Sequence, residues 1–167
     1  EKRLSAITET APDAIVCIKP GDIAYLWNRK AEEMFGYTAE EVVGKEAHPR
    51  MVPENKIKEA RAGLETFFKT GEGPLVGKTV ELTAHRRDNS EFPVELSVSA
   101  MRIKDEWHST AIIRDITERK KAEEELAKHV DELERYMKAT VQREFRVKEL
   151  RDENERLKAK LKEMGKG

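Results

Sequence analysis

The stretch EFPVELSVSAMR at residues 91–102 carries an apolar side chain at alternate positions, at Phe92, Val94, Leu96 and Val98. Successive side chains of a strand point to opposite faces, so this alternation predicts a strand with one apolar face. The turn-forming segment RDNS precedes it, and alternation at 78–85 predicts the strand before that turn. After a second turn at Asp105 and Glu106, residues 107–116 predict another strand.

The first half of the chain supplies two more strands and three helices. The segments 14–18 and 22–27 predict strands joined by a turn at Pro20 and Gly21. Helices are expected after Asn28, after Thr38 and at residues 54–69, because Asn and Thr are favoured at helix N-caps and apolar residues recur at helical spacing. Five strands with the helices held on one side predict an α+β fold.

Composition divides the chain near residue 117. No proline occurs after Pro93, and residues 118–167 are dominated by charged side chains. We therefore expect a lead-in helix at 1–10, a sensor domain at 11–117 and a long helix at 118–167. The chain begins at Glu1 rather than at a methionine, so a longer parent protein is expected.

Charge and cysteine content narrow the class of protein. The 32 basic and 33 acidic residues nearly cancel, which disfavours nucleic acid as a partner. The single cysteine, Cys17, excludes an internal disulfide and suits a reducing, cytoplasmic location. No apolar run reaches the ~18 residues that a membrane span needs.

Three stretches together resemble the bacterial sensor PAS family over residues 1–120. They are NRKAEEMFGY at 28–37, RDNSEFPVE at 87–95 and DITER at 115–119. The resemblance implies a five-stranded antiparallel sheet with helices on one face. It also implies a role in sensing a small molecule, a redox state, light or a partner, and in relaying that state through flanking helices.

Asp115 and Thr117 are the candidate relay residues, because they lie where the last strand meets the charged helix. Thr117 is expected to cap that helix, and Glu118 suits its first turn. Movement of the strand would then reach the helix through a hydrogen-bonded cap. A purely capping role is the simpler interpretation, and the two roles are compatible.

Two cofactor types known in the family are disfavoured, and the cofactor stays unknown. The helix histidine that ligates haem in sensors of the FixL type corresponds to Ala60, and the arginine that steadies bound oxygen corresponds to Val80. Sensors of the LOV type use a cysteine that the loop at 44–50 lacks, since Cys17 lies on the first strand. His48 and His85 stay open as haem ligands, as does flavin held without a covalent bond; no metal site is expected.

A small-molecule pocket could lie between the sheet and the helix at 54–69. The apolar side chains expected to line it are Met34, Leu64, Phe67, Val80, Leu82, Leu96, Val98 and Ile113. The alternative is that these side chains simply fill the core. Periodicity does not distinguish a filled core from one that holds a ligand.

The C-terminal helix carries two apolar stripes that predict a parallel coiled-coil homodimer. The first stripe is Leu126, Val130, Leu133 and Met137, and the second is Val147, Leu150, Asn154, Leu157, Leu161 and Met164. Asn154 falls at an a position, where asparagine selects an in-register parallel dimer. Met137 and Val147, both at a, are ten residues apart, three more than one heptad. We expect a continuous, strained helix through 138–146, with a bend or a helical hairpin as the alternatives.

No motif for catalysis is recognised. The sequence has no glycine-rich phosphate loop and no nucleophile motif, and the surroundings of His129 do not resemble the phosphorylated helix of histidine kinases. We therefore expect a non-enzymatic sensory input module whose parent protein could be a histidine kinase. A ligand-free dimerisation module is the alternative, and a haem or flavin sensor is a third hypothesis.

Overall fold

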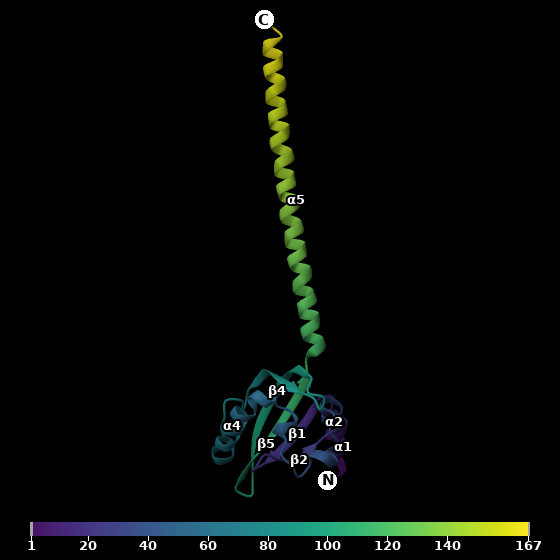
Figure 1. Ribbon diagram of the computed structural model, residues 1–167, viewed down its shortest axis with the longest axis vertical. Coiled ribbons are helices and arrows are strands. Elements are labelled where there is room, and N and C mark those ends of the chain that lie inside the picture. Colours follow the sequence, from purple (N-terminus) through teal and green to yellow (C-terminus); the bar gives the residue numbers. More distant parts are fainter. Residues whose placement is uncertain (1, 167) are drawn as a thin grey trace. The chain divides into compact units, whose positions relative to one another are not determined.

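A computed structural model describes residues 2–166, with side chains from Ala6 onward (Figure 1). Glu1 and Gly167, the end residues of the expected lead-in and C-terminal helices, lie outside the described residues. The chain forms two compact units, Glu1–Lys120 and Lys121–Gly167. The first unit is a small α+β domain that includes the start of a long helix, and the second is the rest of that helix.

The domain is built on one antiparallel sheet in the strand order β2-β1-β5-β4-β3. Its strands are β1 (Ala14–Lys19), β2 (Ile23–Trp27), β3 (Thr79–His85), β4 (Glu91–Ile103) and β5 (Glu106–Asp115). The two N-terminal strands join the three later ones through the β1–β5 pair, where Val16 faces Ala111. The five-stranded antiparallel sheet expected from the sequence is confirmed.

The alternation in β4 selects the face that carries the core. Phe92 and Val94 are buried, and Leu96 packs partly buried against the same cluster. The ring of Phe35 lies between Phe92 and Trp27, with ring centroids 5.9 and 5.4 Å away. Aromatic side chains from the sheet and from the helix that follows β2 therefore meet at the centre of the domain.

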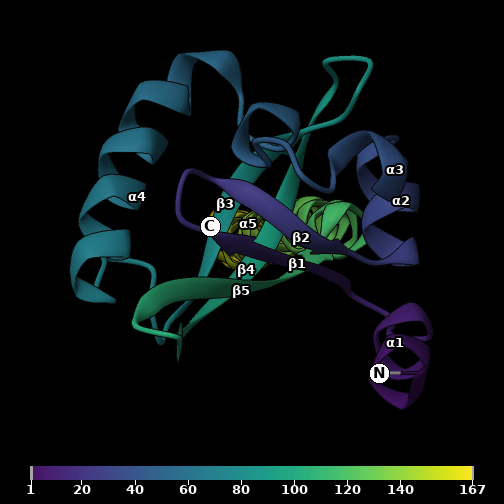
Figure 2. The ribbon, with the colours of Figure 1, turned by 90° about the horizontal axis from the view of Figure 1, so that it is seen from below.

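Two of the short helices begin directly after the cap residues that the sequence indicates, Asn28 and Thr38. The short helices are α1 (Lys2–Glu9), α2 (Arg29–Phe35), α3 (Ala39–Val42) and α4 (Ile57–Thr70), with two 3-10 turns, η1 (His48–Arg50) and η2 (Glu54–Lys56). Asn28 accepts a hydrogen bond from the Ala31 N–H at 3.0 Å, and Thr38 forms a capping box with Glu41. Figure 2 shows α4 at one end of the sheet and α2 with α3 at the other.

The helix predicted at 54–69 is divided, because its first turn is 3-10 and α4 begins only at Ile57. Lys56 offers α4 no side-chain cap, and a tighter first turn is a common way to begin a helix. The segment expected as loop at 45–53 also contains the single turn η1, which has Pro49 in it.

Helix α5 (Thr117–Met164) runs for 48 residues without a break. It is continuous through residues 138–146, as expected. None of its described residues is buried, so both apolar stripes face solvent in the single chain. Within residues 2–166, no helix combines the length and the apolar character that crossing a membrane requires.

Candidate functional site

The junction between β5 and α5 is organised by the carboxylate of Asp115. Its Oδ1 accepts hydrogen bonds from the backbone N–H of Thr117 at 2.9 Å and from the Thr117 hydroxyl at 2.6 Å. Its Oδ2 accepts from Arg86 at 2.7 Å. The sequence predicted Thr117 as the cap, whereas in these contacts the acceptor is Asp115 and the Thr117 hydroxyl donates to it.

The protonation state of Asp115 follows from the same contacts. Partial burial raises the pKa of Asp115, but hydrogen bonds from Thr117 and Arg86 outweigh burial and hold that pKa below its ordinary value of 3.8. Asp115 is therefore an anion near neutral pH, able to accept from both partners at once.

The junction is also fixed to the core. Ile116 is 2% exposed, and its N–H donates to the carbonyl of Pro93 in β4 at 3.1 Å. The guanidinium of Arg86 lies over the ring of Phe92, 3.7 Å from its centroid, and donates to the carbonyl of Met34 at the end of α2. One arginine thus joins the core, α2 and the first residues of α5.

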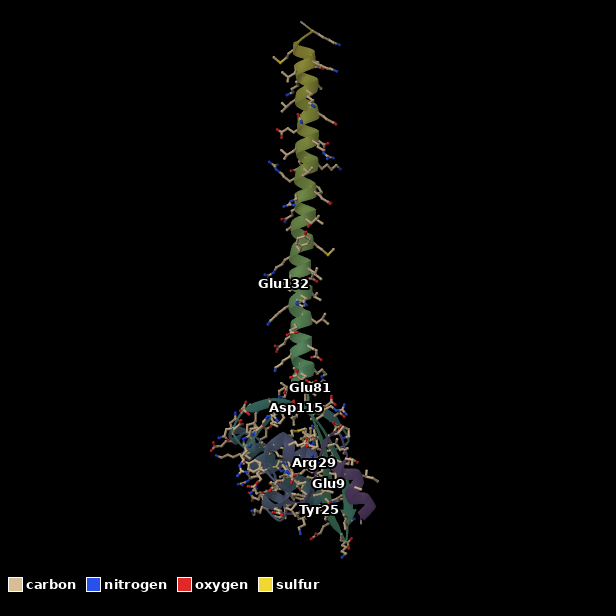
Figure 3. The ribbon with its side chains drawn as sticks, turned by 90° about the vertical axis from the view of Figure 1, so that its right-hand side faces the viewer. Glu9, Tyr25, Arg29, Glu81, Asp115 and Glu132 are labelled. Carbon is tan, nitrogen blue, oxygen red and sulfur yellow. The ribbon has the colours of Figure 1, made fainter. Side chains whose placement is uncertain are left out.

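The first turn of α5 pairs with two acidic residues of the sheet. Arg119 contacts Glu95 of β4 at 3.1 Å and also Glu81 of β3, and Lys120 contacts Glu81 at 2.5 Å. The hydrogen bond from Lys120 lowers the pKa of Glu81. Figure 3 places Glu81 and Asp115 together at the end of the domain where α5 begins.

Asn28 connects the N-terminal segment to the sheet and to α2. Its side chain, in a residue that is 1% exposed, makes four hydrogen bonds. The side-chain oxygen accepts from the N–H groups of Ile15 and Ala31, and the side-chain nitrogen donates to the carbonyls of Thr8 and Asp13. The Asp13 carboxylate in turn accepts two hydrogen bonds from Arg114 of β5, at 2.9 and 2.8 Å.

The eight residues expected to line a pocket differ in their surroundings. Met34, Phe67 and Ile113 are buried, whereas Leu64, Val80, Leu96 and Val98 are only partly covered. Leu82 is 42% exposed, although it pairs with the buried Val94, because β3 is an edge strand. Two open furrows lie on the surface of α5, at residues 158–162 and around Val147.

The histidines considered as haem ligands have partners within the protein. His48 Nδ1 lies 2.6 Å from the buried carboxylate of Asp22, and His85 Nε2 lies 3.2 Å from the carbonyl of Pro49. Within residues 2–166, no group of three or more His, Cys, Asp or Glu side chains is placed to hold a metal ion. These contacts favour structural roles for both histidines.

Cys17 is buried on β1, and its sulfur lies 3.4 Å from the hydroxyl of Thr110. Burial, followed by the proximity of Cys17, raises the pKa of Tyr25 to about 12. The Cys17 side chain therefore packs as a small residue of the core.

The family model for the PAS domain matches residues 12–118 of this chain. The chain belongs to the PAS family. Sensor protein FixL of Bradyrhizobium diazoefficiens is 29% identical over 133 residues, which cover 80% of this chain and 26% of FixL. A protein of Azorhizobium caulinodans is 33% identical over 114 residues, which cover 68% of this chain and 16% of that protein.

The fold of the PAS domain recurs in solved structures. The PAS domain of an HTR-like protein from Haloarcula marismortui superposes with a TM-score of 0.54 at 24% identity, covering 69% of this chain and 90% of that one. This likeness confirms the PAS fold expected from the three sequence stretches. PAS domains are in general sensory rather than catalytic modules, and this chain spans about a quarter or less of the two relatives named above.

The sequence analysis did not predict the ion pairs that surround the junction between β5 and α5. Arg86, Glu81 and Glu95 lie in two strands and a turn far in sequence from Asp115 and Arg119, so no local pattern connects them. The usable signal was the strand register. Once β3, β4 and β5 are aligned by their apolar alternation, Glu81, Glu95 and Arg114 fall side by side.

Proposed function

We propose that this chain is a sensory PAS input module that relays its state through Asp115 and Thr117 to a dimeric coiled coil formed by α5. The observation that carries the proposal is the direct covalent and hydrogen-bonded continuity between the end of the sheet and α5. A displacement of β5 moves Asp115, and with it the Thr117 N–H at the start of the helix. The receiving output domain would belong to a longer parent protein, for which a histidine kinase is our proposal.

The exposed stripes of α5 support a second copy of the chain as its partner. Helices in proteins gain most of their stability from packing an apolar face against a partner. Leu126, Leu133 and Leu161 are between 61% and 69% exposed in the single chain. Two copies aligned in parallel would cover these side chains and would pair the Asn154 residues across the dimer axis.

Charges beside the second stripe are divided. Arg146 at g and Arg151 at the following e are like charges in a parallel dimer, whereas the next pair favours that arrangement. With Val147 and Asn154 at a, Glu153 falls at g and Lys158 at the following e. In a parallel dimer these positions face each other across the interface, which brings opposite charges together.

The shift of phase between the stripes is a proposed switch point. Met137 and Val147 are ten residues apart within one unbroken helix, so both stripes cannot occupy the same seam without local overwinding. A dimer that relieves the strain in one half increases it in the other. Rotation at the junction could therefore shift the preference between the two halves.

The proposed signal is a small molecule held between the sheet and α4. Partly covered apolar side chains such as Leu64, Val80 and Leu96 support this location. A ligand-free dimerisation module is the second candidate, favoured by the close burial of Met34, Phe67 and Ile113. The alanine at position 60 and the valine at position 80 argue against haem bound in the manner of FixL, and the loop at 44–50 argues against a covalent flavin.

Native mass spectrometry of the purified chain, compared with its denatured mass, tests the proposal. We expect a dimer that carries extra mass, and loss of that mass on denaturation would establish a bound ligand. A dimer without extra mass would favour the ligand-free candidate. A monomer would overturn the coiled-coil relay.

A cytoplasmic location without a nucleic-acid partner is proposed from the single cysteine and the balanced charge.

A further inference from the structure

A strip of charged side chains crosses the end of the sheet. Glu81 of β3 lies directly opposite Glu95 of β4, and Glu95 lies directly opposite Arg114 of β5. Residues paired in this way project from the same face of a sheet, and like charges directly opposite each other are destabilising. The two glutamates therefore need cations to neutralise them.

Two of those cations come from the first turn of α5. Arg119 contacts both glutamates and Lys120 contacts Glu81. Basic side chains at a helix N-terminus are opposed by the helix dipole, which favours anions there. The pairing thus removes an unfavourable interaction in the sheet and another in the helix, so the start of α5 and the strip stabilise each other.

Arg114, the third cation of the strip, is held from the other side. Both of its contacts go to Asp13 in the loop between α1 and β1, a carboxylate whose side chain is only 18% exposed. The charge of Glu95 acts on Arg114 as well, although the structure gives no direct contact between them. Glu95 consequently lies between two arginines and is bonded to one of them, Arg119.

We propose that Asp13 and Glu95 compete for Arg114, and that this competition makes the loop between α1 and β1 an input to α5. While Asp13 holds Arg114, Glu95 is left for Arg119 and the first turn of α5 is secured. When Asp13 is moved or neutralised, Arg114 pairs with its cross-strand neighbour Glu95. The ion pair between Glu95 and Arg119 then weakens. The inference rests on the proposed function, in which α5 carries the output.

Hydrogen exchange of the backbone amides in the first turn of α5, measured on the full chain, tests this coupling. Asp13→Asn removes a charge that does not touch α5, yet these amides should exchange roughly two- to fivefold faster, the size expected for one partly exposed ion pair. Arg114→Gln removes the competitor and should slow exchange, by a smaller factor, because Asp13 already holds Arg114 in the parent. Asp105→Asn, which breaks the Arg102–Asp105 pair in the β4–β5 turn, is the matched control and should change nothing.

The opposite signs of the two variants are the decisive result. A variant that merely damages the domain speeds exchange, so faster exchange in both Asp13→Asn and Arg114→Gln would overturn the proposal. Equal behaviour of Asp13→Asn and Asp105→Asn would also overturn it. In a Glu95→Gln background the effect of Asp13→Asn should vanish, and its persistence would count against the competition.

Failure of this inference and failure of the proposed function give different results. The exchange of these amides is measured within the PAS domain, which includes the chain as far as Lys120. A monomer in mass spectrometry would overturn the relay and leave the exchange result unaffected. If Asp13→Asn does not fold, Arg114→Gln decides alone, because a damaged domain does not slow exchange.

Discussion

Arg86 donates a hydrogen bond to Asp115 across 2.7 Å, although 29 residues separate them in the sequence. The same guanidinium lies over Phe92. The last residue of β5 is therefore held by a group that packs on the core, so a change in core packing has a short route to the start of α5.

Replacing Thr117 by valine should destabilise the PAS domain. The variant keeps the shape of the side chain and removes the hydroxyl that donates to Asp115 at 2.6 Å. We expect the free energy of unfolding to fall by about 0.5–1.5 kcal/mol, the usual net value of one hydrogen bond. Urea denaturation measures the change, and Thr117→Ser, which keeps the hydroxyl, should stay close to the parent. Equal losses in both variants would contradict the role of the hydroxyl.

Acid should weaken the junction in a defined direction. The pKa of Asp115 is held below its unfolded value of 3.8, so its contribution to stability is fully present above that value and is lost as pH falls through the folded pKa. The hydrogen bond from Arg114 lowers the pKa of Asp13, which adds to the same trend. Urea unfolding followed across this acid range should show a shallower loss in Asp115→Asn than in the parent. Parallel acid limbs would refute the assignment to Asp115.

Gly71 and Gly63 should respond in opposite ways to replacement by alanine. Gly71 ends α4 with φ +72°, and a Cβ there would lie 2.5 Å from the ring of Trp107. We expect Gly71→Ala to cost about 1–3 kcal/mol of unfolding free energy, from backbone strain and the clash. Gly63, within α4, has open space around its Cβ position. Gly63→Ala should raise stability by about 0.5–1 kcal/mol, and thermal unfolding compares the two. Equal losses would argue against the close approach of Trp107.

Replacing Asn154 by valine should make the coiled coil more stable and less specific. An asparagine at a lowers stability but fixes register and oligomeric state. Sedimentation equilibrium should show a tighter association with species larger than the dimer. Asn55→Val makes the same chemical change in the exposed turn η2 and should leave association unchanged. An unaltered dimer in Asn154→Val would place Asn154 outside the seam.

Removing residues 139–141 should bring the two stripes into one register. Met137 and Val147 would then be seven residues apart, so the dimer should melt at a higher temperature and respond less to a signal. Circular dichroism at several protein concentrations measures the melting. Removing residues 138–144 shortens the helix by one heptad and keeps the phase shift, so it is the matched control. Equal melting of the two deletions would eliminate the phase shift as a source of strain.

The architecture could be predicted because its signals are local. Burial in β4 follows the alternation at Phe92 and Val94, and the ends of α2 and α3 follow from the capping chemistry of Asn28 and Thr38. Each of these patterns is set within a few residues. The three PAS stretches add their order and spacing, which no single one of them supplies.

What escaped prediction depends on contacts between distant segments. The exposure of Leu82 follows from the edge position of β3, which the strand order determines and alternation alone does not. Arg86 has many carboxylates available in the sequence, and only the fold selects Asp115. The residues around Thr117 indicated a cap but not which side chain accepts the hydrogen bond.

The four hydrogen bonds of Asn28 limit which residues can replace it. Aspartate would keep the acceptor, lose both donors to Thr8 and Asp13, and leave a charge in the interior. Glutamine has the same groups on a stem one methylene longer, in a site that has no room for it. Aspartate and glutamine, the two nearest replacements, therefore each break part of the connection that holds the entry of the chain to the sheet and α2.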